Sequence, residues 1–590
     1  MSEEIKITVV IDDEIQNTDK EAKKPKRILL TQDPFMTLLS VLQKNRLLVG
    51  SLCGGRGECG RCAVQFLDGA PMPSALERKH FSPEELRRGY RLACIARPRT
   101  DCVIRLLQSA EPKVPILTKT IPLSENIDLS GQEKKGTENQ TAGVTESERN
   151  LLRNASAVSN NKTHVTDYMI AVDLGTTTIA MQLVSMVSGE AVDTYCEHNP
   201  QRSYGADVLS RVQASCAGHR EELQRLVCEA LLRGLRRFLS CLAMRCEEIG
   251  TLRGICIAGN TTMEHLLLGY DVQSLGRSPF TPVEIGVQET TLASLFACLN
   301  QNASETDRKI WEDKVLRCLP VYLTPGISAF VGGDVAAGLY AMRMLPGFGD
   351  TGGVRFLVDL GTNGEMAITD GKHMLATATA AGPAFEGGGE NALIGTDRIA
   401  LTASFLKRGI LDETGLLAEP YFSEGVPVEP IRSHIAAGAA GSRMTAGQVL
   451  SGANMESGQG TSCRMKKEDI RALQMAKAAI RAGIEILWQE MGRPRVDMVY
   501  LAGGFGYQLD VEAAFAIGLL PVRLRGRVQA VGNTSLAGAY LLGRALWEGR
   551  IDRRALTETL SSGSMVESIN LAKRKSFATL YLQYMNLEEN

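Results

Sequence analysis

The sequence predicts two unlike folded units, a small α+β unit over residues 1–107 and a much larger α/β unit over residues 166–590. Four cysteines fall between short apolar, strand-like runs near the N-terminus and mark the small unit. Residues 108–165 are polar and lack apolar periodicity, which predicts a flexible linker. Beyond it, strand-like and helix-like segments alternate, and strands end repeatedly in glycine-rich turns, as is typical of α/β proteins.

The composition is that of an ordinary globular protein. Of the 590 residues, 44% are hydrophobic and 22% are charged, which excludes collagen-like and wholly disordered chains. The net charge of -2 does not indicate a nucleic-acid partner or an anionic membrane. The N-terminal MSEEIKITVV is acidic where a secretory signal is basic, and Pro325 interrupts the most apolar long stretch, 321–342. We therefore expect a cytoplasmic protein with reduced thiols, no membrane span and no nucleic-acid partner.

Local patterns predict each element of the small unit. Short apolar runs indicate strands, and a longer periodic run indicates a helix. Ser82, with Glu85 three residues later, predicts a helix start through a capping box. The other predicted elements are, in order, strands at 5–11 and 27–30, a helix at 35–44, a glycine- and cysteine-rich loop at 50–62, and strands at 63–69 and 101–107.

Four cysteines of the small unit have a spacing that suits an iron–sulfur cluster. Cys53, Cys59, Cys62 and Cys94 form the pattern C-x5-C-x2-C-x31-C. Three thiolates in one loop can wrap a [2Fe–2S] cluster while the fourth closes the cage from a separate element. Structural zinc prefers two C-x2-C pairs and only one is present, so zinc and inert core thiols are the weaker alternatives. Cys102 lies outside the pattern and is expected in the core.

Three strand-to-turn junctions of the large unit are typical of phosphate and nucleotide binding. MIAVDLGTTT and FLVDLGTNGE each place an aspartate at the end of an apolar strand, Asp173 and Asp359, where it can hold hydrated Mg²⁺. The turns that follow offer backbone N–H groups and hydroxyls to phosphates. LAGGFG at 501–506 lets a nucleoside approach the backbone. The turn residues are Gly175, Thr176, Thr177, Thr178, Gly361, Thr362, Asn363, Gly364, Gly503, Gly504 and Gly506. Ordinary glycine-turned hairpins are the alternative.

These motifs carry two resemblances. Residues 1–107 resemble plant-type (adrenodoxin-like) ferredoxins, which implies a ferredoxin-like β-grasp fold with Cys53, Cys59, Cys62 and Cys94 as cluster ligands. The ordered junctions after residue 166 resemble the two-lobed ASKHA ATPase fold of acetate and sugar kinases, heat-shock ATPases and actin. VGGDVAAGLYA and GNTSLAGAYLLGRAL resemble the small-residue helices that connect the lobes in that fold.

As a whole, the chain resembles the reductive activators of corrinoid proteins. Further family-like stretches lie at 198–212, 258–269, 324–334 and 381–390, although spacing alone assigns them no role. The resemblance implies that ATP hydrolysis drives an electron from the cluster to a corrinoid protein and reduces Co(II) to Co(I). Because the segment between the two units is short and polar, we expect any compact middle domain of relatives to be reduced or missing.

The resemblance also implies cofactors and partners. They are a [2Fe–2S] cluster, ATP, Mg²⁺, a corrinoid protein, an upstream low-potential reductant and a homodimer. Asp334 and Glu386 lie beside glycines in loops that could face the nucleotide, and an exposed or helix-capping carboxylate is the alternative for each. His164, His198 and His265 have no metal-ligand spacing and are expected to pack or to lie on the surface.

Three other functions compete. An ATP-dependent donor to another low-potential metalloenzyme, such as a radical-type dehydratase, would carry paired cysteines within the ATPase, and none follow residue 166. In a small-molecule kinase, the predicted electron-carrying cluster would have no function. A redox-sensing module would bind ATP and change conformation without turnover.

Overall fold

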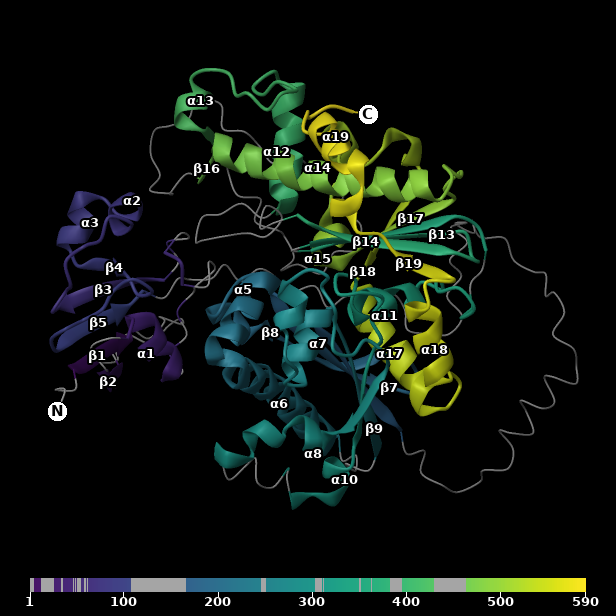
Figure 1. The fold of residues 1–590 in the computed structure, drawn as a ribbon, viewed down its shortest axis with the longest axis horizontal. Helices are drawn as coiled ribbons and strands as arrows, with labels where there is room; N and C mark the ends of the chain where they lie inside the picture. The colour runs from purple at the N-terminus through teal and green to yellow at the C-terminus, as the bar shows by residue number, and fades with distance from the viewer. Residues whose placement is uncertain are drawn as a thin grey trace, which may run out of the picture.

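The computed structural model describes the chain in segments, and the predicted linker at residues 108–165 lies outside them. The described residues are 5–11, 26–32, 36–45, 47, 49, 55–57, 60, 62–107, 166–245, 251–302, 310, 312–349, 352–361, 363–381, 395–428 and 463–589. Figure 1 shows an N-terminal sheet beside a larger body with two lobes.

The N-terminal sheet has the strand order β2-β1-β5-β3-β4. Its first strand is antiparallel to the second and parallel to the last, which is β-grasp topology and confirms the predicted fold class. The helix begins three residues later than predicted because the hydroxyl of Thr37 caps it, accepting from the N–H of Ser40 at 3.2 Å. The elements are β1 (Ile5–Ile11), β2 (Lys26–Gln32), α1 (Leu38–Lys44), β3 (Ala63–Asp68), α2 (Glu77–His80), α3 (Pro83–Arg87), β4 (Tyr90–Leu92) and β5 (Cys102–Leu106).

The capping box at Ser82 is confirmed. The Ser82 hydroxyl accepts from the N–H of Glu85 at 3.3 Å, and the Glu85 carboxylate accepts from the N–H of Ser82 at 2.7 Å. These two bonds satisfy backbone donors that the first helical turn leaves unpaired, so α3 starts at Pro83. The helix leads into β4, a three-residue strand that the sequence analysis missed.

The larger body contains two six-stranded sheets, one in each lobe. The first lobe has the order β10-β11-β9-β6-β7-β8 and the second β18-β17-β12-β13-β14-β19. The first set is β6 (Tyr168–Leu174), β7 (Thr178–Ser185), β8 (Ala191–His198), β9 (Leu252–Gly259), β10 (Gln288–Thr291) and β11 (Pro320–Leu323). The second set is β12 (Arg355–Leu360), β13 (Asn363–Thr369), β14 (Met374–Ala380), β17 (Met498–Ala502), β18 (Val528–Gly532) and β19 (Val566–Ser568).

Five strands of each sheet repeat the same order and directions. Each lobe has an antiparallel meander, β6-β7-β8 or β12-β13-β14. On the other side of the meander's first strand lies a parallel strand, β9 or β17, and a second parallel strand, β11 or β18, pairs with that one. Asp173 consequently pairs in register with Ala258 of β9, and Asp359 with Ala502 of β17. The junction at the end of β9, GICIAGNTT at residues 254–262, is therefore the counterpart of LAGGFG in the second lobe.

Two helices cross between the lobes, α11 (Gly333–Ala341) and α17 (Thr534–Trp547), as Figure 1 shows. A Cβ atom on Gly538 would lie 2.0 Å from the carbonyl oxygen of Ala337, and one on Gly338 would lie 2.7 Å from Thr534 Oγ1. The approach to backbone excludes any side chain at Gly538, and one at Gly338 would have to displace the hydroxyl of Thr534. Helices α11 and α17 are the two small-residue helices that the sequence analysis expected to connect the lobes.

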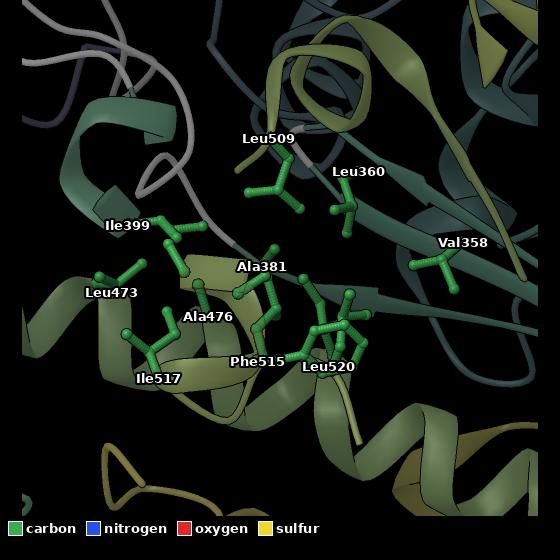
Figure 2. Close-up of a cluster of buried hydrophobic side chains, with 14 of the residues drawn as sticks. Val358, Leu360, Ala381, Ile399, Leu473, Ala476, Leu509, Phe515, Ile517 and Leu520 are labelled. Atoms are coloured by element: carbon green, nitrogen blue, oxygen red, sulfur yellow. The ribbon is translucent and has the colours of Figure 1, made fainter. Parts of the chain in front are cut away.

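Separate cores stabilise the lobes. In the first, α6 (Arg220–Met244) packs on the sheet, and in the second, α14 (Lys467–Glu490) does so. The apolar face of α14 is buried in this second core, and Figure 2 shows Leu473 near Ile399 and Phe515 beside Leu520. The remaining helices are α5 (Val208–Ala214), α7 (Thr261–Leu267), α8 (Leu292–Leu295), α10 (Lys314–Arg317), α12 (Gly395–Lys407), α13 (Tyr421–Glu424), α15 (Gly503–Gln508), α16 (Val511–Ala516), α18 (Arg553–Ser561) and α19 (Lys575–Gln583).

No helix in the part of the chain that the structure describes combines the length and the apolar character needed to cross a lipid bilayer.

Candidate functional site

The first glycine-rich hairpin, between β6 and β7, is held by three side chains from outside it. Asn199 donates from Nδ2 to the carbonyl of Gly175 at 2.9 Å, and Asn260 donates from Nδ2 to Thr176 Oγ1 at 2.9 Å. The buried guanidinium of Arg211 donates to the carbonyl of Thr176. Because the turn carbonyls are engaged in this way, the turn has one defined conformation.

Asn199, Asn260 and Arg211 are functional residues that the sequence analysis missed. They belong to residues 198–212 and 258–269, two of the family-like stretches to which the sequence analysis assigned no role. Each asparagine also caps its own helix through Oδ1, Asn199 at the 3-10 helix η1 (Pro200–Ser203) and Asn260 at α7. An asparagine between a strand and a helix predicts a helix cap from sequence alone. Its other partner, the hairpin, is remote in sequence and could not be predicted in this way.

The second hairpin, between β12 and β13, lies against the LAGGFG turn. Gly361 donates its N–H to the carbonyl of Asn363 at 3.0 Å, which closes the hairpin, and Gly364 lies on β13. Gly503 has φ +81°, and a Cβ atom there would lie 2.5 Å from Asp359 Oδ1. Only glycine therefore fits where this turn meets the aspartate. Thr362 lies outside the described residues.

The other LAGGFG glycines belong to α15, which begins at the end of β17. Gly504 and Gly506 are in its first turns, and Gly506 is buried against Leu501. The structure thus brings all three predicted glycines to the strand end beside Asp359.

Asp173 links the lobes. It accepts from Asn533 Nδ2 at 2.8 Å and from Ser535 Oγ at 2.9 Å, and both partners belong to the start of α17 after β18. Asn533 also caps α17, since its Oδ1 accepts from the N–H of Leu536 at 2.8 Å. Asn533 and Ser535 are further residues that no motif had identified, although GNTSLAGAYLLGRAL contains them.

Five carboxyl groups gather between the two hairpins: Asp173, Glu264, Asp334, Asp359 and Glu365. All five are half-buried, and burial is the main cause that raises the pKa of each. Burial and then the charges of neighbouring aspartates raise the pKa of Asp359 to about 7. The pKa of Asp334 is also raised to about 7, by burial first and by Asp173, although its bond from the N–H of Val335 opposes the shift.

This arrangement fits a hydrated divalent cation. Carboxylates that repel one another in a half-buried site are stabilised when a cation lies between them. Among the described residues, no group of three or more His, Cys, Asp or Glu side chains could hold a metal ion on its own. A cation here would therefore take water and phosphate oxygens as further ligands, as Mg²⁺ does at nucleotides.

Asp334 lies in this acidic group, in the first turn of α11, whereas Glu386 lies outside the described residues. His265 packs as expected: Nδ1 lies 2.7 Å from the carbonyl of Thr261, and Nε2 accepts from the N–H of Val283 at 3.0 Å. Burial lowers the pKa of this imidazole. His164 lies outside the described residues.

The cysteine site lies at the end of the N-terminal sheet. Cys62 and Cys94 are buried with their Sγ atoms 3.2 Å apart, well beyond a disulfide bond length. The two segments are tied together because Ala93 donates its N–H to the carbonyl of Cys62 at 2.8 Å. Cys53 and Cys59 lie outside the described residues.

The loop before Cys62 follows a path that glycine adopts more readily than other residues. Its glycines at 55, 57 and 60 all have positive φ, at 88°, 76° and 70°. His80 supports the loop, with Nε2 2.9 Å from the carbonyl of Gly57. Cys102 is buried in the core, where desolvation raises its pKa to about 12, as expected of a thiol outside the ligand set.

Three family models match the chain. They are the 2Fe-2S iron-sulfur cluster binding domain over residues 23–99, the RACo middle region over 168–346, and the C-terminal domain of RACo, the ASKHA domain, over 353–397 and 390–590. The chain is built from the domains of the RACo family. The matched middle region is the first lobe. The expectation of a reduced or missing compact domain concerned residues 108–165, which lie outside the described residues, and it stays a prediction.

The chain is also similar to curated relatives and to a solved structure. Corrinoid activation enzyme RamQ of Eubacterium limosum is 27% identical over 423 residues, which span 65% of each chain. One component of the Na(+)-translocating NADH-quinone reductase of Shewanella denitrificans is 42% identical over 69 residues, 12% of this chain and 17% of that relative. A solved reductive activator for corrinoid, iron-sulfur protein shares the fold, with a TM-score of 0.55, 22% identity and 98% of both chains covered.

Proposed function

We propose that this RACo-family protein uses ATP to drive an electron from a [2Fe–2S] cluster to a corrinoid protein, reducing inactive Co(II) to Co(I). The observation that carries the proposal is the pairing, in one chain, of a buried cysteine site with two facing aspartate–glycine hairpins. The partner class follows from the printed names of RamQ and of the solved activator.

At the N-terminal site, Cys53, Cys59, Cys62 and Cys94 would hold the cluster, which supplies one-electron transfer. The buried pair Cys62 and Cys94 would keep these cluster ligands away from water, and the positive-φ glycines would let the loop follow a tight path around the cluster. A separate low-potential reductant must restore the electron after each turnover.

At the large site, the two hairpins would bind the nucleotide between the lobes. Gly175 and Thr176–Thr178 on one side, and Gly361–Gly364 on the other, would hold phosphates through N–H groups and hydroxyls. Asp173 and Asp359 would orient Mg²⁺ and the attacking water, and the metal neutralises charge that develops on the phosphates. Gly503, Gly504 and Gly506 would admit the adenosine.

ATP is needed because the electron transfer is uphill. Plant-type clusters have potentials of about −400 mV, and the Co(II)/Co(I) couple lies lower. Residues that bridge the lobes, such as Asp173 with Asn533 and Ser535, would adjust when a nucleotide binds. Such a change favours one relative position of the lobes and so one docked geometry with the corrinoid protein.

Anaerobic spectroscopy of cobalt tests the proposal. With a reduced cluster, a Co(II) corrinoid protein and Mg-ATP, the wild-type chain should produce the Co(I) spectrum, and omitting ATP should abolish it. Cys94→Ser should lose the cluster spectrum and the activity, whereas the matched core variant Cys102→Ser should keep both. If the wild-type protein forms no Co(I) with any candidate corrinoid protein, the proposed function is wrong.

A further inference from the structure

The N-terminal domain touches the first lobe through α1 and the cysteine loop. Gln43 Nε2 donates to the carbonyl of Ser203 at 2.5 Å, and this amide is buried although it lies on a surface helix of its own domain. Arg56, in the loop between Cys53 and Cys59, donates to Gln213 Oε1 at 3.3 Å at the exposed edge of the contact. In Figure 1, α1 and α5 lie on the facing sides of the two bodies.

Both acceptors belong to one short stretch, residues 199–214, which we call the bridging segment. It contains η1 and α5, and its interior hydrogen bonds make it compact. Arg211 Nε donates to the carbonyl of Gly205 at 3.1 Å, and Asp207 caps α5 by accepting from the N–H of Ser210 at 2.7 Å.

The bridging segment also holds the hairpin between β6 and β7, the first of the two hairpins predicted to bind phosphate. Asn199 at its start binds the carbonyl of Gly175, and Arg211 near its end binds the carbonyl of Thr176. Arg211 and Gln213 are two positions apart on α5, so their side chains point to nearly opposite sides of the helix. One side of α5 therefore faces the hairpin and the other faces the N-terminal domain.

We propose that the bridging segment couples phosphate binding at the first hairpin to the docking of the N-terminal domain beside it. A shift of the hairpin must either move the segment with it or break the hydrogen bonds of Asn199 and Arg211, and buried bonds of this kind are costly to leave unmade. Moving the segment displaces Ser203 and Gln213, the two acceptors for the N-terminal domain. The ligand class is the polyphosphate of a nucleoside triphosphate, so this inference rests on the proposed nucleotide site.

Linkage supplies the test, because coupling between two equilibria is reciprocal. The double variant Gln43→Ala/Arg56→Ala removes both contacts and leaves the hairpin untouched. Arg87→Ala, an exposed arginine of the same domain on α3, is the matched control. Calorimetry on the full chain with reconstituted cluster would measure the dissociation constant for a non-hydrolysable ATP analogue, and hydrogen exchange would follow residues 38–60 with and without that analogue.

We expect the double variant to shift the dissociation constant by roughly fivefold or more, the lower range of measured couplings, while Arg87→Ala does not shift it. The analogue should change exchange at residues 38–60 in the wild type but not in the double variant. The coupling would be overturned, and the nucleotide site left intact, by two results together. The wild type and the double variant would have equal dissociation constants, and the analogue would not change hydrogen exchange at residues 38–60. A wild-type chain that binds no nucleotide would instead refute the proposed nucleotide site and the coupling with it.

Discussion

Asn199, Asn260 and Asn533 each use both ends of the side-chain amide. The oxygen caps a helix, and the nitrogen donates to Gly175, Thr176 or Asp173 at the first hairpin. An aspartate would cap equally well but has no N–H to donate, and a serine is too short to reach both partners. At the residue scale, the site is therefore built by side chains that connect secondary structure to the hairpin.

Asp359→Asn should separate stability from activity. The pKa of Asp359 in the folded protein, about 7, lies above its unfolded value, so the folded state resists ionisation and loses stability as the pH rises toward 7. Removing the charge should raise the free energy of unfolding of the nucleotide-free protein by about 1–2 kcal/mol at pH 8, and by less at pH 5. ATP hydrolysis should fall at least roughly 100-fold. Urea unfolding and a phosphate-release assay measure the two effects.

Asp370→Asn is the matched control in the same lobe. This exposed aspartate accepts from the N–H groups of Lys372 and His373, and although desolvation opposes them, these bonds help to lower its pKa. We expect Asp370→Asn to lower the free energy of unfolding slightly at pH 8, whereas Asp359→Asn should raise it. The rate of ATP hydrolysis should not change in this control. If Asp359→Asn destabilises the protein as well, the carboxylates do not repel one another as inferred.

At the scale of elements, the crossing of α11 and α17 decides how closely the lobes approach. Gly538→Ala would place a methyl group against the carbonyl of Ala337, where the structure leaves 2.0 Å. Because the added methyl group would meet the backbone of α11, the two helices must move apart. We expect the free energy of unfolding to fall by about 3 kcal/mol. Thermal unfolding followed by circular dichroism would measure it, with the exposed helical variant Ser561→Ala expected within about 0.5 kcal/mol of wild type.

Helix α14 holds the C-terminal segment through buried polar groups. Gln474 Nε2 donates to the carbonyl of Met585 at 3.0 Å, and Lys477 donates to the carbonyl of Asn586. Arg481 lies 4.6 Å from the ring centroid of Tyr584. Burial, followed by the charge of Arg481, lowers the pKa of Lys477 to about 7.

The pH dependence of stability should reveal Lys477. Its folded pKa lies below its unfolded value, so between pH 7 and about pH 10 the unfolded chain binds more protons at this site and stability rises with pH. One such proton contributes a slope of up to about 1.4 kcal/mol per pH unit. Lys477→Met should flatten the curve between pH 7 and 9, whereas Lys467→Met, at the start of the same helix, should not. Parallel curves for all three proteins would contradict the shift.

At the scale of the whole molecule, two lobes of one topology face each other and the cysteine domain lies beside the first. The repeated strand–aspartate–glycine pattern predicted Asp173 and Asp359, because a buried strand that ends in a tight turn leaves a strong local signal. The partners of Asp173 could not be predicted in this way. Asn533 and Ser535 are more than 350 residues distant, and only the crossing of α17 under the first sheet brings them close.

The sequence alone determined the β-grasp class, the capping box at Ser82, the two aspartate hairpins and the small residues of the crossing helices. The capping box and the hairpins depend on contacts between neighbours in the chain, which local spacing records, whereas the β-grasp class and the crossing helices were predicted from resemblance to known families. Only the tertiary structure decided which polar side chains hold the hairpins, how five carboxyl groups gather between them, and that residues 199–214 face both the hairpin and the cysteine domain. Such contacts join remote segments, and their geometry follows from packing rather than from any local pattern.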